Sequence, residues 1–424
     1  MTVVPGTGEP SGQLEPATSS DAASADDRRP AREAGIESKA RARPELDTET
    51  LLTYAALSTF GYLLNGLGPV LPFLQADMRV GRSEVAWYPV MFSVAMVVIG
   101  LTGERIVRLT GRRRSFWLAL GALSGGSLLF VATSSQVSSG VGAAVMGLGG
   151  AMIVLLVPAM LSARHGHLAA GAIVEANGLS SGSAILAPLL IAASVAAGVG
   201  WRAGFVVLPF VVVLAIAAAG ARLPIGEAPA APPEHTVMTR TAFEPSFRRR
   251  WLDLVLVVSV EFCFVLWSTD YMITVVGLDH VAGPVIASMF LVGMAVGRVG
   301  GGQFSGRLAR PRPVFFAALA VAAAGFALFW TFHVAVVAGL GLLVAGLGVA
   351  LLYPISLSRA LRAWPEAPDR ASARCALGSG LAIGTAPFVL AFLADHVGLQ
   401  IAYLVVPALL AAAAVNGLTV TRQP

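Results

Sequence analysis

One carboxylate stands out in the sequence because it lies deep inside an apolar run. Glu261 comes about ten residues after Trp251 in the run 251–277, which places it roughly 15 Å along a helix that rises 1.5 Å per residue. An ionised carboxylate at that depth in a membrane is costly, so it is expected to pair with a cation or face a cavity, and to be functional. Two interpretations stay open: a group that takes up and releases a coupling proton, or a neutral or paired acid that serves packing alone.

Arg298 is the only arginine that the sequence places inside an apolar run. Its guanidinium either binds an anionic group of a small molecule or extends along its helix to the membrane surface. Glu175 and Arg374 begin two other apolar runs at corresponding positions. They form either an ion pair between the two halves of the chain or two unrelated charges at the membrane surface. Asp270 lies on the opposite helix face from Glu261, and we expect it at the outer membrane interface.

The first apolar run carries polar side chains at three-, four- and seven-residue spacing, which places them on one helix face. They are Tyr54, Ser58, Tyr62 and Asn65. Such a face is unfavourable against lipid, so it lines a substrate path or forms hydrogen bonds with a neighbouring helix. Ser268, on the helix face of Glu261, and Tyr353 are further candidates for the substrate path. Four polar residues of a later run are expected mainly to hold helices together: Asn177, Ser180, Ser181 and Ser183.

Other kinds of chemistry find no support in the residue pattern. The sequence has no Walker lysine motif, no cluster with metal-ligand spacing and no nucleophile elbow. Cys263 and Cys375 lie in apolar runs and are expected to be small buried side chains. No basic groove with interleaved aromatic residues points to nucleic acid. We therefore expect no enzyme and no cofactor, and an ion gradient or the substrate's own gradient as the energy source.

The composition indicates whether most of the chain lies in water or in lipid. The 424 residues are 56% hydrophobic and only 12% charged, and their mean hydropathy is +0.75. Soluble proteins carry about 25% charged residues. Too few polar side chains remain to cover a water-exposed surface of this size, so most of the chain is expected in lipid. Ordinary cytosolic enzymes, nucleic-acid-binding proteins and secreted disulfide-stabilised domains are thereby excluded.

Twelve apolar runs approach the length of about 20 residues that a helix needs to cross a bilayer. They are 51–73, 85–103, 115–134, 139–163, 172–198, 203–221, 251–277, 283–305, 313–332, 334–358, 373–395 and 400–419. They predict an all-α membrane protein with twelve transmembrane helices in two pseudo-symmetric six-helix bundles, 51–221 and 251–424, joined by a cytoplasmic linker at 222–250. Residues 1–50 are polar and lack periodicity, which predicts a disordered cytoplasmic tail.

The placement of the arginines predicts the orientation. With the amino terminus in the cytoplasm, nineteen arginines after residue 50 fall on the cytoplasmic side, whereas Arg79, Arg82 and Arg202 fall outside. Cytoplasmic loops of membrane proteins are enriched in Lys and Arg, so both termini are predicted in the cytoplasm. Lys39 is the single lysine among 29 basic residues, which indicates a G+C-rich bacterium and hence the bacterial inner membrane.

An internal repeat relates the two predicted bundles. Met91-Phe92 recurs as Met289-Phe290, and Gly147-Leu148-Gly149 recurs as Gly346-Leu347-Gly348. These and further matches follow in the same order at an offset of 198 or 199 residues. Two halves related by a parallel repeat place a binding cavity between them near the membrane midplane, reached from each side in turn.

Three passages resemble sequence patterns of the major facilitator superfamily of secondary transporters. Gly100-Leu101-Thr102-Gly103-Glu104-Arg105, with Gly111-Arg112-Arg113-Arg114, resembles the family's Gly-x-x-x-Asp-Arg-x-Gly-Arg-Arg loop, with Glu for Asp and about four extra residues. Gly200-Trp201-Arg202-Ala203-Gly204-Phe205 is similar to the family's turn between helices five and six, and Ser379 to Pro407 to its helices eleven and twelve. The resemblance covers residues 51–421 or so, and it implies transport by alternating access.

The resemblance also implies a conformational gate. In the family, the acid and arginine of the first loop stabilise one of two alternating states by charge pairing across the halves. The matching positions are Gly100, Glu104, Arg105, Gly111 and Arg112, with Gly306 and Arg307 in a mirror copy that lacks the acid. A carboxylate on such a turn can lie against the positive end of a helix dipole. The alternative is that these arginines only anchor the topology.

These observations predict a monomeric secondary transporter of a small organic molecule in the lipid bilayer. We expect proton-coupled efflux of a drug-like or secondary metabolite, with Glu261 as the proton carrier. Uptake of a small organic acid, with Arg298 as the anion contact, is the alternative within this class, and a transport-inactive membrane sensor is an alternative of another class. Ala143 occupies a position where the family's proton-driven exporters often carry an arginine, which argues against their usual antiport machinery.

Overall fold

The computed structural model describes residues 46–132, 135–220, 245–304, 311–364 and 368–419, and most of the predicted tail and linker lies outside these ranges. Every regular element within them is a helix. Twelve of these segments are long and apolar enough to cross a membrane, which confirms the predicted number of spans. Their ends shift by several residues from the prediction, because helices continue past the apolar runs with charged and polar turns.

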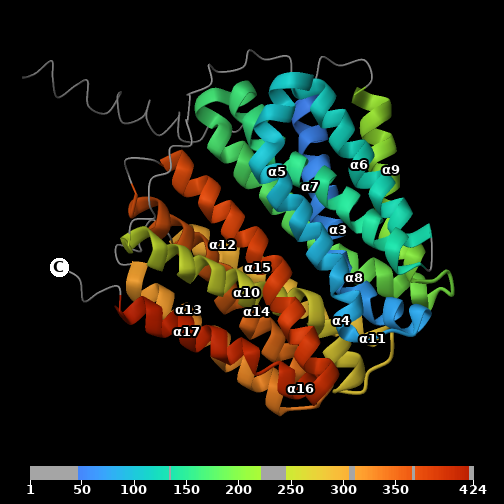
Figure 1. Cartoon of the computed structure of the whole chain (residues 1–424), viewed down its shortest axis with the longest axis vertical. Helices are drawn as coiled ribbons and strands as arrows, with labels where there is room; N and C mark the ends of the chain where they lie inside the picture. Colours follow the sequence, from blue (N-terminus) through green and yellow to red (C-terminus); the bar gives the residue numbers. More distant parts are fainter. Residues whose placement is uncertain (1–45, 133–134, 221–244, 305–310, 365–367, 420–424) are drawn as a thin grey trace, which may run out of the picture. The chain divides into compact units, whose positions relative to one another are not determined.

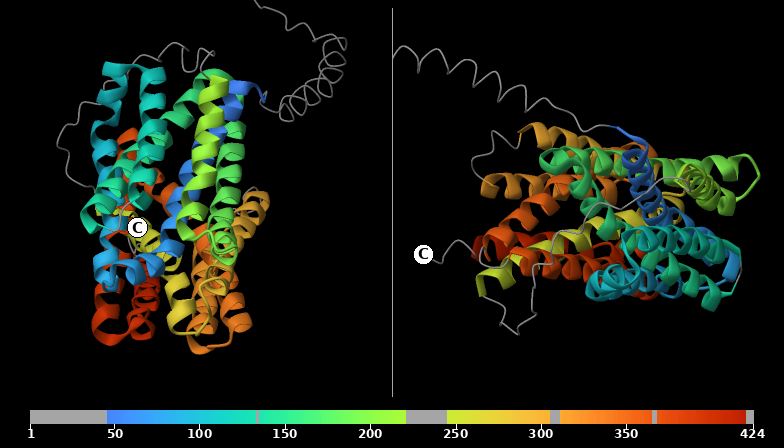
Figure 2. Two further views of the ribbon diagram at one scale, coloured as in Figure 1. Left: turned by 90° about the vertical axis from the view of Figure 1, so that its right-hand side faces the viewer. Right: turned by 90° about the horizontal axis from the view of Figure 1, so that it is seen from above.

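The helices of residues 48–220 pack against one another as one group (Figures 1 and 2). They are α3 (Thr48–Met78), α4 (Arg82–Val85) followed by α5 (Trp87–Thr110), α6 (Arg112–Ala132), α7 (Gln136–His165), α8 (Ala169–Ala196) and α9 (Trp201–Gly220). Helix α3 begins after Asp47, whose Oδ1 accepts the backbone N–H of Thr50 at 2.8 Å. Partial burial opposes its ionisation, but hydrogen bonds from Arg164 and Thr50 lower the pKa of Asp47 below its ordinary value. The cap thus fixes the start of α3 against the end of α7.

The helices of residues 245–419 form the second group (Figure 1). They are α10 (Pro245–Thr274), α11 (Ala282–Ala287) followed by α12 (Met289–Phe304), α13 (Pro311–Thr331), α14 (Ala335–Arg362), α15 (Pro368–Val397) and α16 (Leu399–Ala402) followed by α17 (Val405–Thr419). The order of broken and continuous helices resembles that of the first group. In both groups a short helix precedes the main part of the second span.

The same glycine contacts join the third and fourth spans of each group. A Cβ atom on Gly126 of α6 would collide with the backbone of α7, and one on Gly142 of α7 with the backbone of α6. Gly325 and Gly341 occupy the equivalent places in α13 and α14, at an offset of 199 residues. Absence of a side chain therefore lets these helices touch backbone to backbone, as small residues do in membrane helix pairs. The internal repeat of the sequence thus corresponds to a repeated pattern of contacts between helices.

The two groups meet along α3 and α5 of the first and α10 and α15 of the second. A Cβ on Gly68 of α3 would collide with the backbone of α10 at Val265. The hydroxyl of Ser93 in α5 donates a hydrogen bond to the carbonyl of Gly380 in α15. This close seam brings α3 and α8 opposite α10 and α12, where the site described next is found.

Replacing Gly126 by leucine is expected to destabilise the protein, because the new side chain must occupy space held by the backbone of α7. Overpacking of this kind costs about 1–3 kcal/mol. Gly125→Leu is the matched control, since a Cβ there meets nothing within 4 Å and the gain in helix propensity is the same. Thermal melting of the purified protein is expected to show a lower Tm for Gly126→Leu only. Equal Tm values for the two variants would contradict the glycine contact.

Candidate functional site

A cavity of about 170 Å³ lies where four helices of the two groups meet. Helices α3 and α8 line one side, and α10 and α12 line the other. Its polar lining consists of Asn65, Asn177, Ser180, Ser181, Glu261 and Arg298. Phe60, Phe262 and Met294 are among its apolar lining residues, a set that the sequence did not single out. A pocket that combines apolar walls with convergent polar groups is the usual form of a small-molecule site.

The two membrane-embedded charges meet in this cavity. Nη2 of Arg298 lies 3.3 Å from Oε1 of Glu261, and their side chains are 43% and 14% exposed. Close charge-assisted pairs have N–O distances of about 2.7–2.9 Å, so this contact is loose. Arg298 therefore has exposed donors available for a second acceptor in the cavity, while Glu261 depends on Arg298 as its counterion.

The polar residues of α3 and α8 divide between the cavity and helix contacts. The Asn65 side chain donates to the carbonyl of Gly61 at 2.9 Å, and that of Asn177 to Ile173 at 2.8 Å. Both amides nevertheless line the cavity. Ser180 and Ser181 also line the cavity, whereas we predicted mainly a packing role for them. Each serine has both roles, since its hydroxyl donates a hydrogen bond to a backbone carbonyl while the residue lines the cavity.

The remaining residues of the α3 stripe make contacts between helices. The hydroxyl of Tyr54 donates to Glu175 of α8 at 3.2 Å, and the hydroxyl of Tyr62 donates to the carbonyl of Gly204 in α9. The carbonyl of Ser58 accepts from Ser183 at 2.7 Å. These contacts correspond to the helix-packing alternative for this stripe, and Asn65 is its member in the cavity.

Ser268 and Tyr353 lie beside the cavity lining. Ser268 is 3% exposed and lines a small hollow that shares Asn65 and Leu291 with the cavity. Tyr353 lies near enough to Glu261 and Arg298 to interact with both electrostatically. Within the described ranges, no group of three or more His, Cys, Asp or Glu side chains is placed to hold a metal ion.

The candidate gate at the end of α5 is exposed in this structure. Glu104 and Arg105 are exposed, and Glu104 forms its ion pair with Arg108 on the same helix at 3.8 Å. Gly100 faces the second group, where a Cβ would meet Leu377 of α15 at 3.6 Å. The charge pairing across the halves stays a prediction, since here the acid bonds within its own helix.

Gly111 ends α5 with φ of 80°, a backbone conformation that glycine adopts without steric cost. It allows Arg112 to begin α6 directly afterwards. Gly306 and Arg307 lie outside the described residues. Glu175 and Arg374 have different neighbours, because Glu175 accepts from Tyr54 and the Arg374 guanidinium lies 5.1 Å from the ring centre of Trp364. Their ion pair also stays a prediction.

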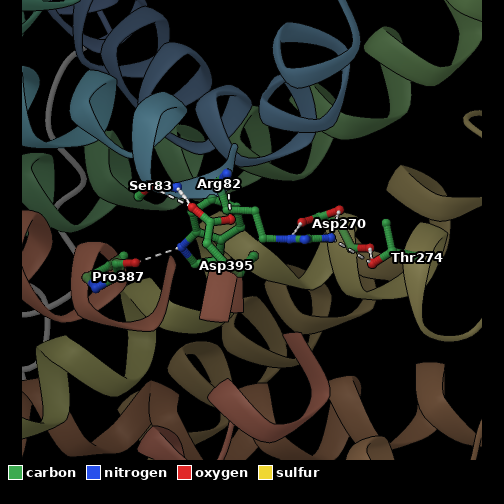
Figure 3. A network of polar contacts seen from close by, with 7 residues as sticks. Arg82, Ser83, Asp270, Thr274, Pro387 and Asp395 are labelled. Atoms are coloured by element: carbon green, nitrogen blue, oxygen red, sulfur yellow. Dashed lines mark hydrogen bonds and ion pairs between the residues drawn. The ribbon is translucent and has the colours of Figure 1, made fainter. Parts of the chain in front are cut away.

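At α4, the start of the span Arg82–Thr110, a polar cluster that the sequence analysis missed joins the two groups (Figure 3). Nε of Arg82 in α4 lies 2.6 Å from Oδ2 of Asp270 in α10. Asp270 is 1% exposed and lies one turn before Thr274, where its span ends; its place near the membrane interface stays a prediction, whereas its burial between the two groups was not predicted. Its burial is possible because Arg82 supplies a counterion from the other group. The available signal was that Arg82 is one of few arginines on the predicted outer side.

Asp395 completes this cluster from α15 (Figure 3). Its Oδ1 accepts the backbone N–H of Arg82 at 2.9 Å, and its Oδ2 accepts the N–H and the hydroxyl of Ser83 at 2.8 and 2.6 Å. A carboxylate in this position caps the first turn of a helix. Here the cap and the helix come from different groups, so α4 is attached to the second group by both its backbone and its side chain.

Comparisons with known proteins agree with this architecture. The model of the Major Facilitator Superfamily matches residues 51–369. A protein of Streptomyces coelicolor named as a probable actinorhodin transporter is 30% identical over 179 residues, which are 40% of this chain and 30% of that protein. The chain thus aligns with less than a third of the length of this relative.

Solved structures share the fold at low sequence identity. The nucleoside transporter NupG has a TM-score of 0.73 at 11% identity, covering 88% of this chain and 99% of NupG. A bacterial homologue of the human lysosomal transporter Spinster, in an inward-facing and occupied conformation, has a TM-score of 0.68 at 12% identity, covering 88% and 96%. A D-xylose–proton symporter has a TM-score of 0.67 at 15% identity, with the same coverage.

Arg82→Gln is expected to open the end of the molecule at α4, because it leaves the buried carboxylate of Asp270 without its cation. Truncating one partner of a buried, hydrogen-bonded pair costs roughly 2–5 kcal/mol. Spin labels at the exposed residues Ala76 and Ile401 report the separation of the two groups by double electron–electron resonance. The native Cys263 and Cys375 are buried and should not compete for the label. We expect a larger fraction at long distances in the variant.

Arg202→Gln is the control for this measurement. Arg202 pairs with Asp77 at 2.9 Å, and both belong to the first group. Its loss should leave the distances between the groups unchanged. If Arg82→Gln and Arg202→Gln give the same distance distribution, the Arg82–Asp270 pair does not hold the groups together.

Proposed function

Because the chain belongs to the major facilitator superfamily, we propose that it is a proton-coupled exporter of a drug-like or secondary metabolite, working by alternating access in the bacterial inner membrane. The observation that carries this proposal is the cavity between the two groups, with a loosely paired carboxylate in its wall. The proposal concerns direction, substrate and coupling ion, whereas transport itself is the activity of the family.

The lining of the cavity suits an organic substrate that has both apolar and polar surface. Phe60, Phe262 and Met294 offer aromatic and polarisable contacts. Asn65 and Asn177 add hydrogen-bonding groups that orient a substrate. The match to a probable actinorhodin transporter supports a secondary metabolite among such substrates. We further propose that the protein acts as a monomer with both termini in the cytoplasm.

Coupling to protons would follow from the loose pair in the cavity. Protonation of Glu261 removes the negative charge that holds Arg298, so the guanidinium is released to other acceptors in the cavity. Loss of the proton restores the pair. A carboxyl group that changes its counterion in this way can link substrate occupancy to proton loading, because both processes involve the same guanidinium.

We also propose that the structure is inward-facing. The arginine bias predicts Arg82 on the outer side, where the cluster with Asp270 and Asp395 joins the groups. The likeness to an inward-facing Spinster homologue agrees with this assignment. The cavity would then be closed from the outside by the cluster at α4.

Glu261→Gln is expected to abolish the acceleration of transport by a pH gradient, because glutamine cannot carry the proton. The measurement is flux of actinorhodin in proteoliposomes with and without an imposed gradient, for wild type and variant. Glu84→Gln, at an exposed residue outside the cavity, is the control and should keep the acceleration. Unchanged proton dependence in Glu261→Gln would remove Glu261 from the coupling role. Absence of wild-type flux across a broad panel of metabolites would favour the membrane sensor.

Uptake of a small organic acid is the second candidate function, and the exposed guanidinium of Arg298 in the cavity favours it. If it holds, wild-type proteoliposomes take up benzoate, Arg298→Gln loses this uptake, and Arg298→Lys retains part of it because the charge remains. Benzoate uptake that is equal in wild type and Arg298→Gln would contradict an anion contact at this residue.

A further inference from the structure

A third ion pair of α10 lies near its start, away from the cavity. Asp253 is 1% and Arg359 6% exposed, and Nη1 of Arg359 lies 3.6 Å from Oδ2 of Asp253. This separation exceeds the usual hydrogen-bond distance. Oδ1 of Asp253 accepts from Asn416 of α17 at 2.6 Å. Among the described residues, neither Nη1 of Arg359 nor Oδ2 of Asp253 has a hydrogen-bond partner.

The arginines around this pair outnumber its single acid. Arg250, Arg312 and Arg362 all lie near enough to Arg359 to repel it electrostatically. Arg250 also acts electrostatically on Asp253, so two arginines share this one acid, and within the part of the chain that the structure describes neither Arg250 nor Arg362 forms a close ion pair. Asp253 therefore faces the guanidinium groups of Arg359 and Arg250, and Arg362 lies beside Arg359. Arg359 is buried and Arg250 half-buried, so their shared positive charge is unfavourable unless an anion offsets it, and the exposed Arg362 lies at the edge of the same cluster.

Membrane topology alone does not account for the arrangement. An arginine that only orients the chain extends its guanidinium into water. Arg359 instead lies over the ring of Phe315 at 4.7 Å, inside the second group. Asp253 precedes Glu261 by eight residues of α10, or about 12 Å, so the substrate cavity is too distant to supply the anion.

The position of the cluster indicates which anion is at hand. Arg250 lies at the start of the seventh span, Ser246–Thr274, and Arg362 ends the tenth span, Ala335–Arg362. Ends of membrane spans lie at the depth of lipid headgroups, and basic pockets between helices at that depth suit phosphate. We propose that the cluster of Arg250, Arg359 and Arg362 with Asp253 binds the phosphate of an anionic phospholipid. The phosphate oxygens accept from Arg250 and Arg362, and the buried Arg359 adds to the attracting field.

The experiment compares lipids on the purified full chain in detergent. Dioleoylphosphatidylglycerol or dioleoylphosphatidylcholine is added, and native mass spectrometry measures the retained lipid while thermal melting measures its protective effect. We expect the wild type to retain the anionic lipid preferentially and to melt at a higher temperature with it. In Arg250→Gln/Arg362→Gln this preference should fall about 30-fold, from an attraction near 1 kcal/mol per arginine.

Arg114→Gln/Arg248→Gln is the control, because it removes the same charge at two exposed arginines, and Arg248 lies on the same turn of α10 as Arg250. It should keep the lipid preference. The proposal is overturned if the wild type and Arg250→Gln/Arg362→Gln retain the two lipids alike, or if the control loses as much. Protection by inorganic phosphate equal to that by phosphatidylglycerol would overturn the lipid assignment. If the double variant does not fold, Arg362→Gln at this exposed residue gives the same comparison with a loss of about fivefold.

Discussion

A carboxylate buried in a membrane-spanning helix needs a cation beside it, and α10 carries three such carboxylates. They are Asp253 with Arg359 of α14, Glu261 with Arg298 of α12, and Asp270 with Arg82 of α4. The acids follow one another at intervals of eight and nine residues, or about 12–14 Å along the helix. At three depths, therefore, electrostatic attraction holds α10 to three different helices. The depth and rotation of this helix position the cavity, the cluster at α4 and the arginine cluster at its start.

The three pairs differ in burial and in the elements that they join. The pairs of Asp253 and Glu261 lie within the second group, so a movement of one group against the other leaves them intact. The pair of Asp270 crosses between the groups and must break in such a movement. The pair of Glu261 has the more exposed guanidinium, with 43% of the Arg298 side chain accessible against 22% for Arg82. One helix thus carries two pairs within its own group, one of them with an accessible guanidinium, and a third pair that crosses to the other group.

Features that depend on local sequence could be predicted, and features that depend on contacts between distant segments could not. Hydropathy and the repeat were sufficient for the twelve spans and the two halves. Glu261 and Arg298 each stood out as a charge in an apolar run, but their pairing depends on which faces of α10 and α12 meet. The burial of Asp270 could not be predicted, because its counterion lies 188 residues earlier in the chain. No local pattern reveals that an arginine from the other half reaches it.

The connection at α4 has a further physical consequence, because two interactions there depend on one short segment. Arg82 contributes its guanidinium to Asp270 and its backbone N–H to Asp395. Asp270 and Asp395 both belong to the second group, so moving α4 away from that group removes the ion pair and the helix cap together. Asp270 is 1% exposed, so its carboxylate stays uncompensated after the separation until water or another cation reaches it, whereas Asp395 is already exposed. By contrast, the Gly68 contact of α3 with α10 is a non-directional backbone contact. The two contacts therefore resist separation of the groups in different ways, the cluster at α4 by compensating a buried charge and the Gly68 contact by close packing.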